Sequence, residues 1–299
     1  MPEGDTLRRL ADKLGARFVG ERVVSNAFRH PRLATSDLSG KVLSSVDATG
    51  KHLLCRFDDD ITMHLHLLMQ GKVMFDTTVE APEWRRRFEI EFESGTLTGV
   101  DVPLLHLIPT RNEQDLLGQL GPDLCGSYDH AVALARLEAA QDMQLAEALL
   151  DQTVIAGFGN IYAVETPFIC GVSPFTRIGD IDDVRYVLSI GASLIRTNAT
   201  LGPQNTTGRN LHLAEQWVLP SRTTSCGICG DRLGRLSGQQ SPWRRRTAWC
   251  PSCQPNDATR PDLDRAARLL SLHPARRMID FANGELLADT AEPVVARRR

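Results

Sequence analysis

The sequence predicts an α+β protein of several domains, in which one helix and a series of short strands come first, further helices follow, and a cysteine-rich segment comes after them. Residues 22–108 consist of short alternating or β-branched runs separated by glycine or aspartate. Residues 128–200 instead repeat apolar side chains at helical spacing. Residues 221–254 contain four of the seven cysteines and few apolar residues. We therefore predict domains at 1–120, 121–220 and 221–254, followed by a weakly ordered tail at 255–299.

The first predicted element is an amphipathic helix over residues 5–18, with Gly20 as its stop signal. Its apolar residues share one face: Leu7, Leu10, Leu14 and Phe18. In the strand region, the clearest run is RFEIEFE (87–93), where apolar and charged residues alternate as in a strand with one solvated face. Repeated short strands of this kind favour an antiparallel sandwich or a barrel, and the pattern does not distinguish the two.

The composition changes at GPDL (121–124), and four helices are predicted after it, within residues 128–140, 143–157, 160–168 and 180–197. In the run LLDQTVIAGFGNIYAVE (149–165), we expect one helix to end at Gly157 and Asn160 to cap the next. The N-terminus of a helix attracts phosphate, and the flanking glycines would permit a close backbone approach. A plain helix–turn–helix packing unit is an equally good interpretation of this run alone.

The bulk composition is that of a soluble globular protein, with 42% hydrophobic and 24% charged residues. No apolar run reaches the roughly 18 residues of a membrane helix, and the N-terminus lacks the order of a secretory signal. We therefore expect a cytoplasmic protein. The net charge of −3 does not by itself indicate nucleic acid, but residues 221–254 hold one acid against six arginines: Arg222, Arg232, Arg235, Arg244, Arg245 and Arg246. Such a basic module on an acidic body indicates a local nucleic-acid footprint, although a solvated loop would also explain residues 244–246.

The clustered cysteines form two Cys-x-x-Cys pairs at the spacing of a tetrahedral zinc site: Cys226, Cys229, Cys250 and Cys253. Disulfides or a redox dithiol are alternatives, but two matched pairs in a cytosolic chain argue against both. With four protein ligands the zinc would be structural. It would support the hairpin SGQQSPWRRRTAW (237–249), which presents arginines between two tryptophans to a phosphate backbone.

The chain begins MPEGDT, and this start has two interpretations. As structure, Pro2 suits the first turn of a helix. As chemistry, removal of Met1 would make Pro2 a secondary amine that can form an iminium ion with an aldehyde carbon, beside Glu3. The ten N-terminal residues alone favour the structural interpretation.

Five separated motifs then change that balance: MPEGDT at the start, TGKHL (49–53), HLLMQG (66–71), LLDQTVIAGFGNIYAVE (149–165) and the four-cysteine finger. In this order they resemble the formamidopyrimidine-DNA glycosylase/endonuclease VIII family of base-excision repair enzymes, over residues 1 to about 254. The resemblance implies an N-terminal β-sandwich, a helix–two-turn–helix domain and a zinc finger. It also implies a monomer that grips double-stranded DNA bearing a damaged base or an abasic site.

The resemblance also implies roles for single residues. Pro2 matches the family's nucleophile, which attacks C1′ of the damaged nucleotide, and Glu3 matches its general acid/base. Lys51 matches the lysine that contacts phosphate and assists β-elimination. Arg245, five positions before Cys250, matches the finger arginine of phosphate binding and δ-elimination, a choice over Arg244 and Arg246 made on spacing alone.

Two further DNA contacts follow from the resemblance. Asn160 matches the asparagine that binds backbone phosphate. Met69 matches the residue that fills the gap left by the extruded nucleotide, although an alternating strand could equally place it in the core.

The chain departs from the family's pattern at several points. Thr6 stands where many relatives have a second glutamate, and Gln119 stands where the bacterial endonuclease VIII type often has a DNA-binding arginine. The run GVDVPLLHL (99–107) lacks the arginine and phenylalanine of the oxidised-purine enzymes, which favours oxidised pyrimidines or abasic sites. The approach to the finger, EQWVLPSRTTSC (215–226), lacks the usual Tyr-Gly, and the chain continues past the last cysteine to Arg299.

We therefore expect a bifunctional DNA glycosylase and abasic-site lyase, located in the cytoplasm at a bacterial-type nucleoid. A non-catalytic binder of damaged DNA with the same fold is the alternative, motivated by Thr6 and Gln119. Use of the finger as a protein-docking module is a weaker hypothesis, because it does not explain the N-terminus.

Overall fold

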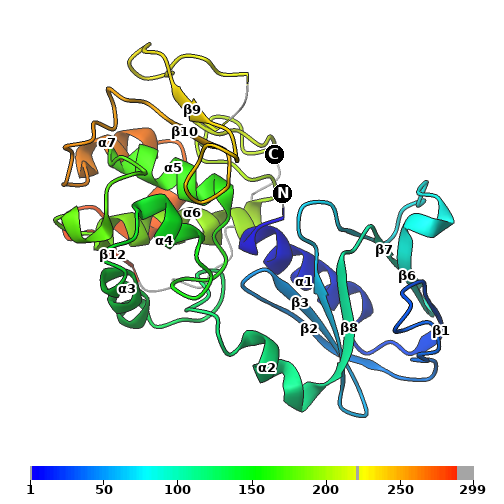
Figure 1. Cartoon of the computed structure of the whole chain (residues 1–299). Helices are drawn as coiled ribbons and strands as arrows, with labels where there is room; N and C mark the ends of the chain where they lie inside the picture. Colours follow the sequence, from blue (N-terminus) through cyan, green and yellow to red (C-terminus); the bar gives the residue numbers. More distant parts are fainter. Residues whose placement is uncertain (1, 220–221, 288–299) are drawn as a thin grey trace. The chain divides into compact units, whose positions relative to one another are not determined.

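The computed structural model describes residues 2–219 and 222–287, and these form two compact units. The first unit contains residues 2–3 and 7–119, and the second contains residues 4–6 and the chain from Leu120 onward. Figure 1 labels many of the helices and strands of both units. None of the described helices is long and apolar enough to cross a membrane.

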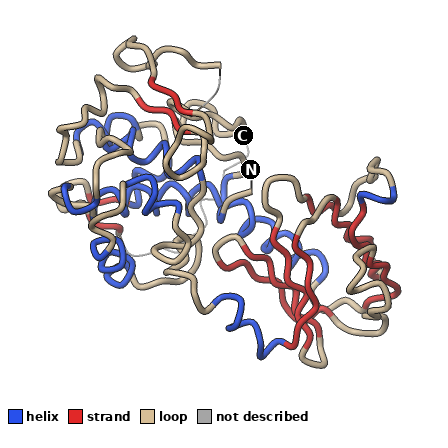
Figure 2. The backbone as a smooth tube through the Cα atoms, in the orientation of Figure 1, coloured by secondary structure: helices blue, strands red, loops and turns tan. Residues whose placement is uncertain are grey.

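The first unit is built on two separate four-stranded sheets, whose paired strands are all antiparallel. Figure 2 shows these strands in red. One sheet has the order β1–β6–β7–β5, formed by Val23–Phe28, Arg86–Phe92, Gly95–Val100 and Lys72–Met74. The other has the order β2–β3–β4–β8, formed by Leu43–Thr49, His52–Phe57, Ile61–His66 and Leu104–Pro109. Apolar residues of both sheets join one buried cluster, so the sandwich prediction is confirmed and the barrel is excluded.

Helix α1 (Gly4–Phe18) packs into this sandwich core, as its apolar face predicts. Phe18 is fully buried and stacks on Phe92, with ring centroids 4.7 Å apart. The helix begins later than the structural interpretation of Pro2 requires. Glu3 is its N-cap residue, in an extended conformation, and Pro2 precedes the helix instead of lying in its first turn. The short elements η1 (Glu83–Arg85), η2 (Thr110–Asn112) and α2 (Glu113–Leu117) complete the first unit.

The second unit is built around the helices α3 (His130–Ala139), α4 (Leu145–Leu150), α5 (Asn160–Cys170) and α6 (Arg185–Leu201), with η3 (Ile178–Asp180) between the last two. The four predicted helices are present, but two boundaries were wrong. Helix α4 ends at Leu150 instead of Gly157, because Asp151 is extended and its side chain binds the backbone of Thr153. Gly159 is the N-cap residue of α5, and Asn160 is its first helical residue instead of its cap.

The cysteine-rich segment packs onto the helices. Its hairpin consists of β9 (Gly234–Leu236) and β10 (Thr247–Trp249). Cys226, Leu233, Ala248 and Cys250 are buried in the same apolar cluster as the helices, so this segment shares the core of the second unit.

The prediction of a weakly ordered tail is wrong for residues 255–287. These residues form α7 (Leu263–Leu269), η4 (Pro274–Met278), β11 (Ile279–Asp280) and β12 (Glu285–Leu286). Ala266, Leu270, Ala275 and Ile279 are buried in the helical core. These apolar residues are spread over short elements, so the segment shows little periodicity even though it contributes to the core. Residues 288–299 lie outside the described residues.

Candidate functional site

The N-terminal motif and the Gly-x-Gly-Asn motif meet in the second unit. The Gly4 N–H donates a hydrogen bond of 2.9 Å to the Gly157 carbonyl. A Cβ on Gly4 would lie 2.8 Å from Gly157 Cα, and Gly157 has a φ of +100°. Both positions therefore require glycine, one for close approach and the other for its backbone conformation. Directly before Gly4, the Glu3 side chain is fully buried.

Asp5 gives the N-terminal segment a second attachment. Its buried carboxylate accepts hydrogen bonds from the Tyr162 hydroxyl at 3.1 Å and from Gln204 Nε2 at 3.0 Å. Thr6, which stands at the position of the family's second glutamate, donates from its hydroxyl to Asp5 at 3.3 Å. Gly4 and Asp5 thus attach the start of the chain to α5 and to the turn that precedes it.

The turn before α5 is shaped by Gln152, which the sequence reading did not single out. Its Nε2 donates to the Phe158 carbonyl at 2.9 Å, and its Oε1 accepts from the Gly157 N–H at 3.1 Å. One side chain therefore fixes the backbone groups of Gly157 and Phe158. The only feature of the sequence that could have indicated this role is the presence of a glutamine in the run LLDQTV.

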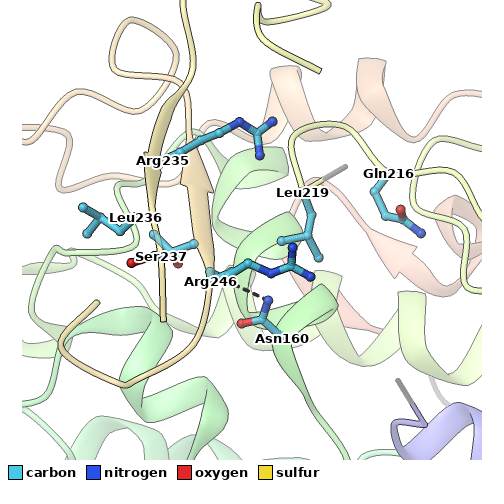
Figure 3. A pocket seen from close by; sticks show the side chains of 8 residues that line it. Asn160, Gln216, Leu219, Arg235, Leu236, Ser237 and Arg246 are labelled. Atoms are coloured by element: carbon cyan, nitrogen blue, oxygen red, sulfur yellow. Dashed lines mark hydrogen bonds between the residues drawn. The ribbon is translucent and has the colours of Figure 1, made fainter. Parts of the chain in front are cut away.

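Asn160 lies at a hollow of about 370 Å³ between α5 and the hairpin (Figure 3). The other lining residues come from the hairpin and from the segment before it: Gln216, Leu219, Arg235, Leu236, Ser237, Arg246 and Thr247. Asn160 Nδ2 donates to the Arg246 carbonyl at 2.9 Å, while its buried Oδ1 has no hydrogen-bond partner among the described residues. Arg246 beside the N-terminus of α5 makes this hollow suitable for an anion, whereas the Arg235 guanidinium donates to the Val218 and Thr223 carbonyls.

The three consecutive arginines of the hairpin are placed differently with respect to this hollow. Arg244, Arg245 and Arg246 are all exposed, and Arg244 has a φ of +54°. Arg246, one position after the predicted Arg245, lines the hollow and accepts the hydrogen bond from Asn160. Sequence spacing could not reveal this, because it depends on how the turn at Arg244 orients the next two residues.

Lys51 lies in the turn between β2 and β3, next to a row of imidazoles that the sequence reading missed. His52 Nδ1 lies 2.8 Å from His64 Nε2, and His64 Nδ1 lies 3.4 Å from His106 Nδ1. Burial, together with neighbouring positive charge, lowers the pKa of His52 to about 4 and that of His64 to about 3. Burial and the charge of Lys51 also lower the pKa of His66. The rings of His52, His64 and His66 are therefore neutral at pH 7.

Met69 lies in the turn at residues 67–71, between β4 and β5, and 59% of its surface is exposed. Its placement in the core is therefore excluded. Leu68, which the sequence reading did not single out, is also exposed, with a φ of +46°. This turn presents two adjacent apolar side chains to solvent.

Two other departures from the family's pattern are visible in the first unit. The connection between β7 and β8 consists only of Asp101, Val102 and Pro103, and Val102 is buried. This connection contains no inserted loop. Gln119, at the end of the first unit, is exposed just after α2.

The four clustered cysteines converge, with their Sγ atoms all within 4.8 Å of one another. Cys226 and Cys253 Sγ are 3.8 Å apart, and Cys229 and Cys250 Sγ are 3.4 Å apart. These separations are too long for disulfides. A tetrahedral metal with bonds to sulfur of about 2.3 Å requires sulfurs about 3.8 Å apart. The four residues therefore fit a metal ion.

Glu165, inside the recognised motif, has a role that the sequence reading did not assign. Its fully buried carboxylate accepts hydrogen bonds from the N–H groups of Trp217, Val218 and Leu219 at 2.6–2.9 Å. The Thr206 hydroxyl adds a fourth at 2.8 Å. Burial raises the pKa of Glu165, and these hydrogen bonds oppose the rise. The carboxylate fixes the segment that leads into the cysteine-rich hairpin.

The predicted site residues are divided between the two units. Pro2, Glu3, Lys51, Met69 and Gln119 belong to the first unit. Asn160, Arg245 and the four cysteines belong to the second, where Asn160 meets the hairpin and the cysteines form one cluster.

Residues 1–102 match the model of the formamidopyrimidine-DNA glycosylase N-terminal domain. A probable endonuclease 8 2 from Streptomyces coelicolor is 35% identical, over 87% of this chain and 96% of the relative. The DNA-(apurinic or apyrimidinic site) lyase Nei2 of Mycolicibacterium smegmatis is also 35% identical, over 85% of this chain and 99% of the relative.

Among solved structures, the Lactococcus lactis Fpg bound to DNA containing N7-benzyl-Fapy-dG is similar, with a TM-score of 0.70. Its sequence identity is 24%, and the match covers 85% of this chain and all of that one. This likeness concerns the fold. The fold, the converging cysteines, the joined N-terminal and Gly-x-Gly-Asn motifs and the sequence matches lead to one conclusion: the chain belongs to the formamidopyrimidine-DNA glycosylase/endonuclease VIII family and is of the endonuclease VIII type.

Proposed function

We propose that this protein is a bifunctional DNA glycosylase and abasic-site lyase of base-excision repair, acting in the cytoplasm as a monomer on double-stranded DNA. The observation that carries the proposal is the attachment of the N-terminal segment: Gly4 and Asp5 are bound to the Gly-x-Gly-Asn turn and to α5. A nucleophile at the end of a chain needs such an anchor, because orientation accounts for much of the rate of an attack. The names of the two relatives, an endonuclease and an abasic-site lyase, support the same activity.

In the proposed reaction, Met1 is removed and the Pro2 nitrogen attacks C1′ of the damaged nucleotide. The C1′–N bond to the base breaks, and the base leaves with the electron pair and takes up a proton. The attacking Pro2 nitrogen loses its own proton, the C1′–O4′ bond of the sugar ring then breaks, O4′ takes up a proton, and the opened sugar becomes an iminium ion on Pro2. Glu3 handles the proton at the sugar. The iminium then accepts the electron pair released when C2′ loses a proton, and the C3′–O bond breaks in β-elimination. Lys51 assists this step at the neighbouring phosphate, and Arg245 assists the following δ-elimination.

We assign the metal of the four-cysteine cluster as a single structural zinc, because two Cys-x-x-Cys pairs with four sulfurs at these distances suit it. Cys226, Cys229, Cys250 and Cys253 would hold it. The bound ion supplies a fixed crosslink beneath the arginine-bearing hairpin.

Borohydride trapping on DNA with an abasic site tests the activity. We expect a covalent adduct that is lost in the Pro2→Gly variant and in protein that retains Met1. The absence of any adduct from the parent protein, with DNA affinity retained, would instead support the non-catalytic binder.

We further propose that oxidised pyrimidines and abasic sites are favoured over oxidised purines. The three-residue connection between β7 and β8 leaves no inserted loop to enter the duplex there. Met69 and its neighbour Leu68 would act as the plug, and Gln119 would make a further contact with the DNA. Oxidised pyrimidines stack poorly and are extruded at lower cost than a paired purine. Kinetics should therefore rank thymine glycol, dihydrouracil or an abasic site above 8-oxoguanine opposite cytosine, and the reverse ranking would contradict this preference.

A further inference from the structure

The segment beyond the cysteines has no role in the proposed reaction, yet it reaches the most buried polar groups of the second unit. His273, between α7 and η4, has only 2% of its surface exposed. Its Nε2 lies 3.1 Å from the Asn205 carbonyl oxygen, and the Ala275 N–H donates to its Nδ1 at 3.1 Å. Because a carbonyl oxygen can only accept, Nε2 carries the proton and Nδ1 accepts. The two hydrogen bonds therefore select one neutral tautomer.

From Asn205, a continuous row of hydrogen bonds leads to the start of the chain. Asn198 Nδ2 donates to the same Asn205 carbonyl at 2.9 Å, and also contacts the Tyr162 hydroxyl at 2.9 Å. The Tyr162 hydroxyl donates to Asp5 at 3.1 Å. Asp5, Tyr162, Asn198 and Asn205 are at most 1% exposed, so the row is shielded from water along its length.

Tight backbone packing joins the same parts. The loop that contains Asn205 also contains Gly208, which has a φ of +75°. A Cβ on Gly208 would lie 2.5 Å from the His273 backbone nitrogen. The Asn205 side chain fixes the rest of this loop, accepting from the Gly208 N–H at 2.7 Å and donating to the Leu213 carbonyl at 2.9 Å. The loop therefore cannot shift without disturbing His273.

At its other end, the row reaches Asp5, which is the neighbour of the hydrogen-bonded residue Gly4. Asp5 directly follows Gly4, whose N–H is bound to Gly157, and only Glu3 separates Gly4 from Pro2. A displacement of about 1 Å at a reacting group can lower a rate about a hundredfold. A small shift of Asp5 is therefore passed along the backbone, through Gly4 and Glu3, to the Pro2 nitrogen.

We propose that residues 255–287 act as a positioning element for the N-terminal amine, with His273 as the positioning residue that holds Asp5 through Asn205, Asn198 and Tyr162. This inference rests on the proposed function, because it presumes that Pro2 is the nucleophile. It gives the segment beyond the finger a role in the chemistry without any contact with DNA.

The test uses the full-length protein with His273→Leu, His273→Gln and, as a matched control, Leu272→Ala, whose parent side chain is 65% exposed. With saturating enzyme on abasic-site DNA, His273→Leu should lower the single-turnover rate of borohydride trapping at least about tenfold. Its affinity for DNA with a reduced abasic site should stay within about twofold of the parent. His273→Gln, which retains a donor at the position of Nε2, should recover most of the rate, and Leu272→Ala should match the parent.

A second readout does not depend on activity. Amide exchange of a peptide covering residues 2–10 should be faster in His273→Leu than in the parent or in His273→Gln, because the row that holds Asp5 loses its support at the Asn205 carbonyl. Equal exchange in all variants would overturn the proposal, as would equal losses of trapping and DNA affinity, which indicate a general loss of structure. A parent protein that formed no adduct would contradict the proposed function. If exchange still changed as expected in that case, His273 would be shown to hold the N-terminal segment, but its role in positioning a nucleophile would be overturned.

Discussion

The two compact units fix their functional residues by different means. In the first, a sandwich core of apolar side chains supports turns, and the turns present Lys51, Leu68 and Met69. In the second, buried polar side chains bind backbone groups far away in the sequence, as Glu165 does with residues 217–219. An apolar core distributes its stabilisation over many contacts, whereas a buried polar group depends on a few partners and is costly to leave unpaired. Among residues that support the site without taking part in the reaction, we therefore expect single substitutions to affect function more sharply in the second unit.

Removal of the metal should produce the largest effect. Chelation, or Cys250→Ser, should unfold the hairpin and lower the affinity for abasic-site DNA by about a hundredfold or more, because the cysteine sulfurs would no longer be joined through one metal ion. The contact between Asn160 and Arg246 would be lost with it. Amide exchange in the β-sandwich should be unchanged, and zinc should restore the binding of the chelated protein. Metal-free protein that binds DNA as tightly as the metal-bound form would contradict the structural role of the metal.

The close approach of Gly4 and Gly157 should give the next largest effect. In Gly4→Ala, the new methyl group would meet Gly157 Cα at 2.8 Å, so the backbones must separate. We expect a loss of about 1–3 kcal/mol in the free energy of unfolding and a slower trapping reaction.

Gly15→Ala is the matched control for this substitution. Gly15 lies in the same helix, and a Cβ there would have nothing within 4 Å. That variant should be more stable than the parent by about 0.5–1 kcal/mol and should trap normally. Similar behaviour of the two variants in denaturation and trapping would show that the close approach at Gly4 is unimportant.

Substitutions of the two neighbouring hairpin arginines, Arg245 and Arg246, should have smaller effects on DNA binding than removal of the metal. Arg246 lines the hollow at Asn160, whereas Arg245 does not. Arg246→Ala should therefore weaken DNA binding about tenfold and reduce the salt dependence by about one phosphate contact, with a smaller loss for Arg245→Ala. Titrations at several salt concentrations measure both quantities. A larger loss for Arg245→Ala would show that Arg245, and not Arg246, makes the stronger phosphate contact.

The comparison of the units also shows what a sequence can reveal. The strands and α1 follow from periodicity, because one apolar face is a local property of the chain. The four cysteines follow from their spacing. The roles of Glu165, Gln152 and His273 do not, because each depends on backbone groups that approach only in the folded chain. The same reason explains the incorrect end of α4 and the order found in residues 255–287.

The imidazole row of the first unit allows one further test, in which the expected loss in the free energy of unfolding is the smallest of those predicted. His64 is 2% exposed and neutral, with His52, His66, His106, Glu113 and Lys51 as the titratable groups that influence it or lie beside the row. Its folded pKa of about 3 lies below the ordinary value of 6.5, so the unfolded chain binds a proton first as the pH falls. The contribution of His64 to the free energy of unfolding is therefore retained above about pH 6.5 and is lost progressively below that pH.

Between pH 7 and pH 5.5 the share of His64 in this loss is about 1 kcal/mol. His64→Gln removes the titrating group, so its free energy of unfolding should fall by about that much less over the same range, whatever its stability at pH 7. Urea denaturation at the two pH values measures the difference, and His212→Gln, in the second unit, serves as the control. An unchanged pH dependence in His64→Gln would mean that the ring is not held neutral, and that the apolar sandwich tolerates a charge where its packing indicates that it should not.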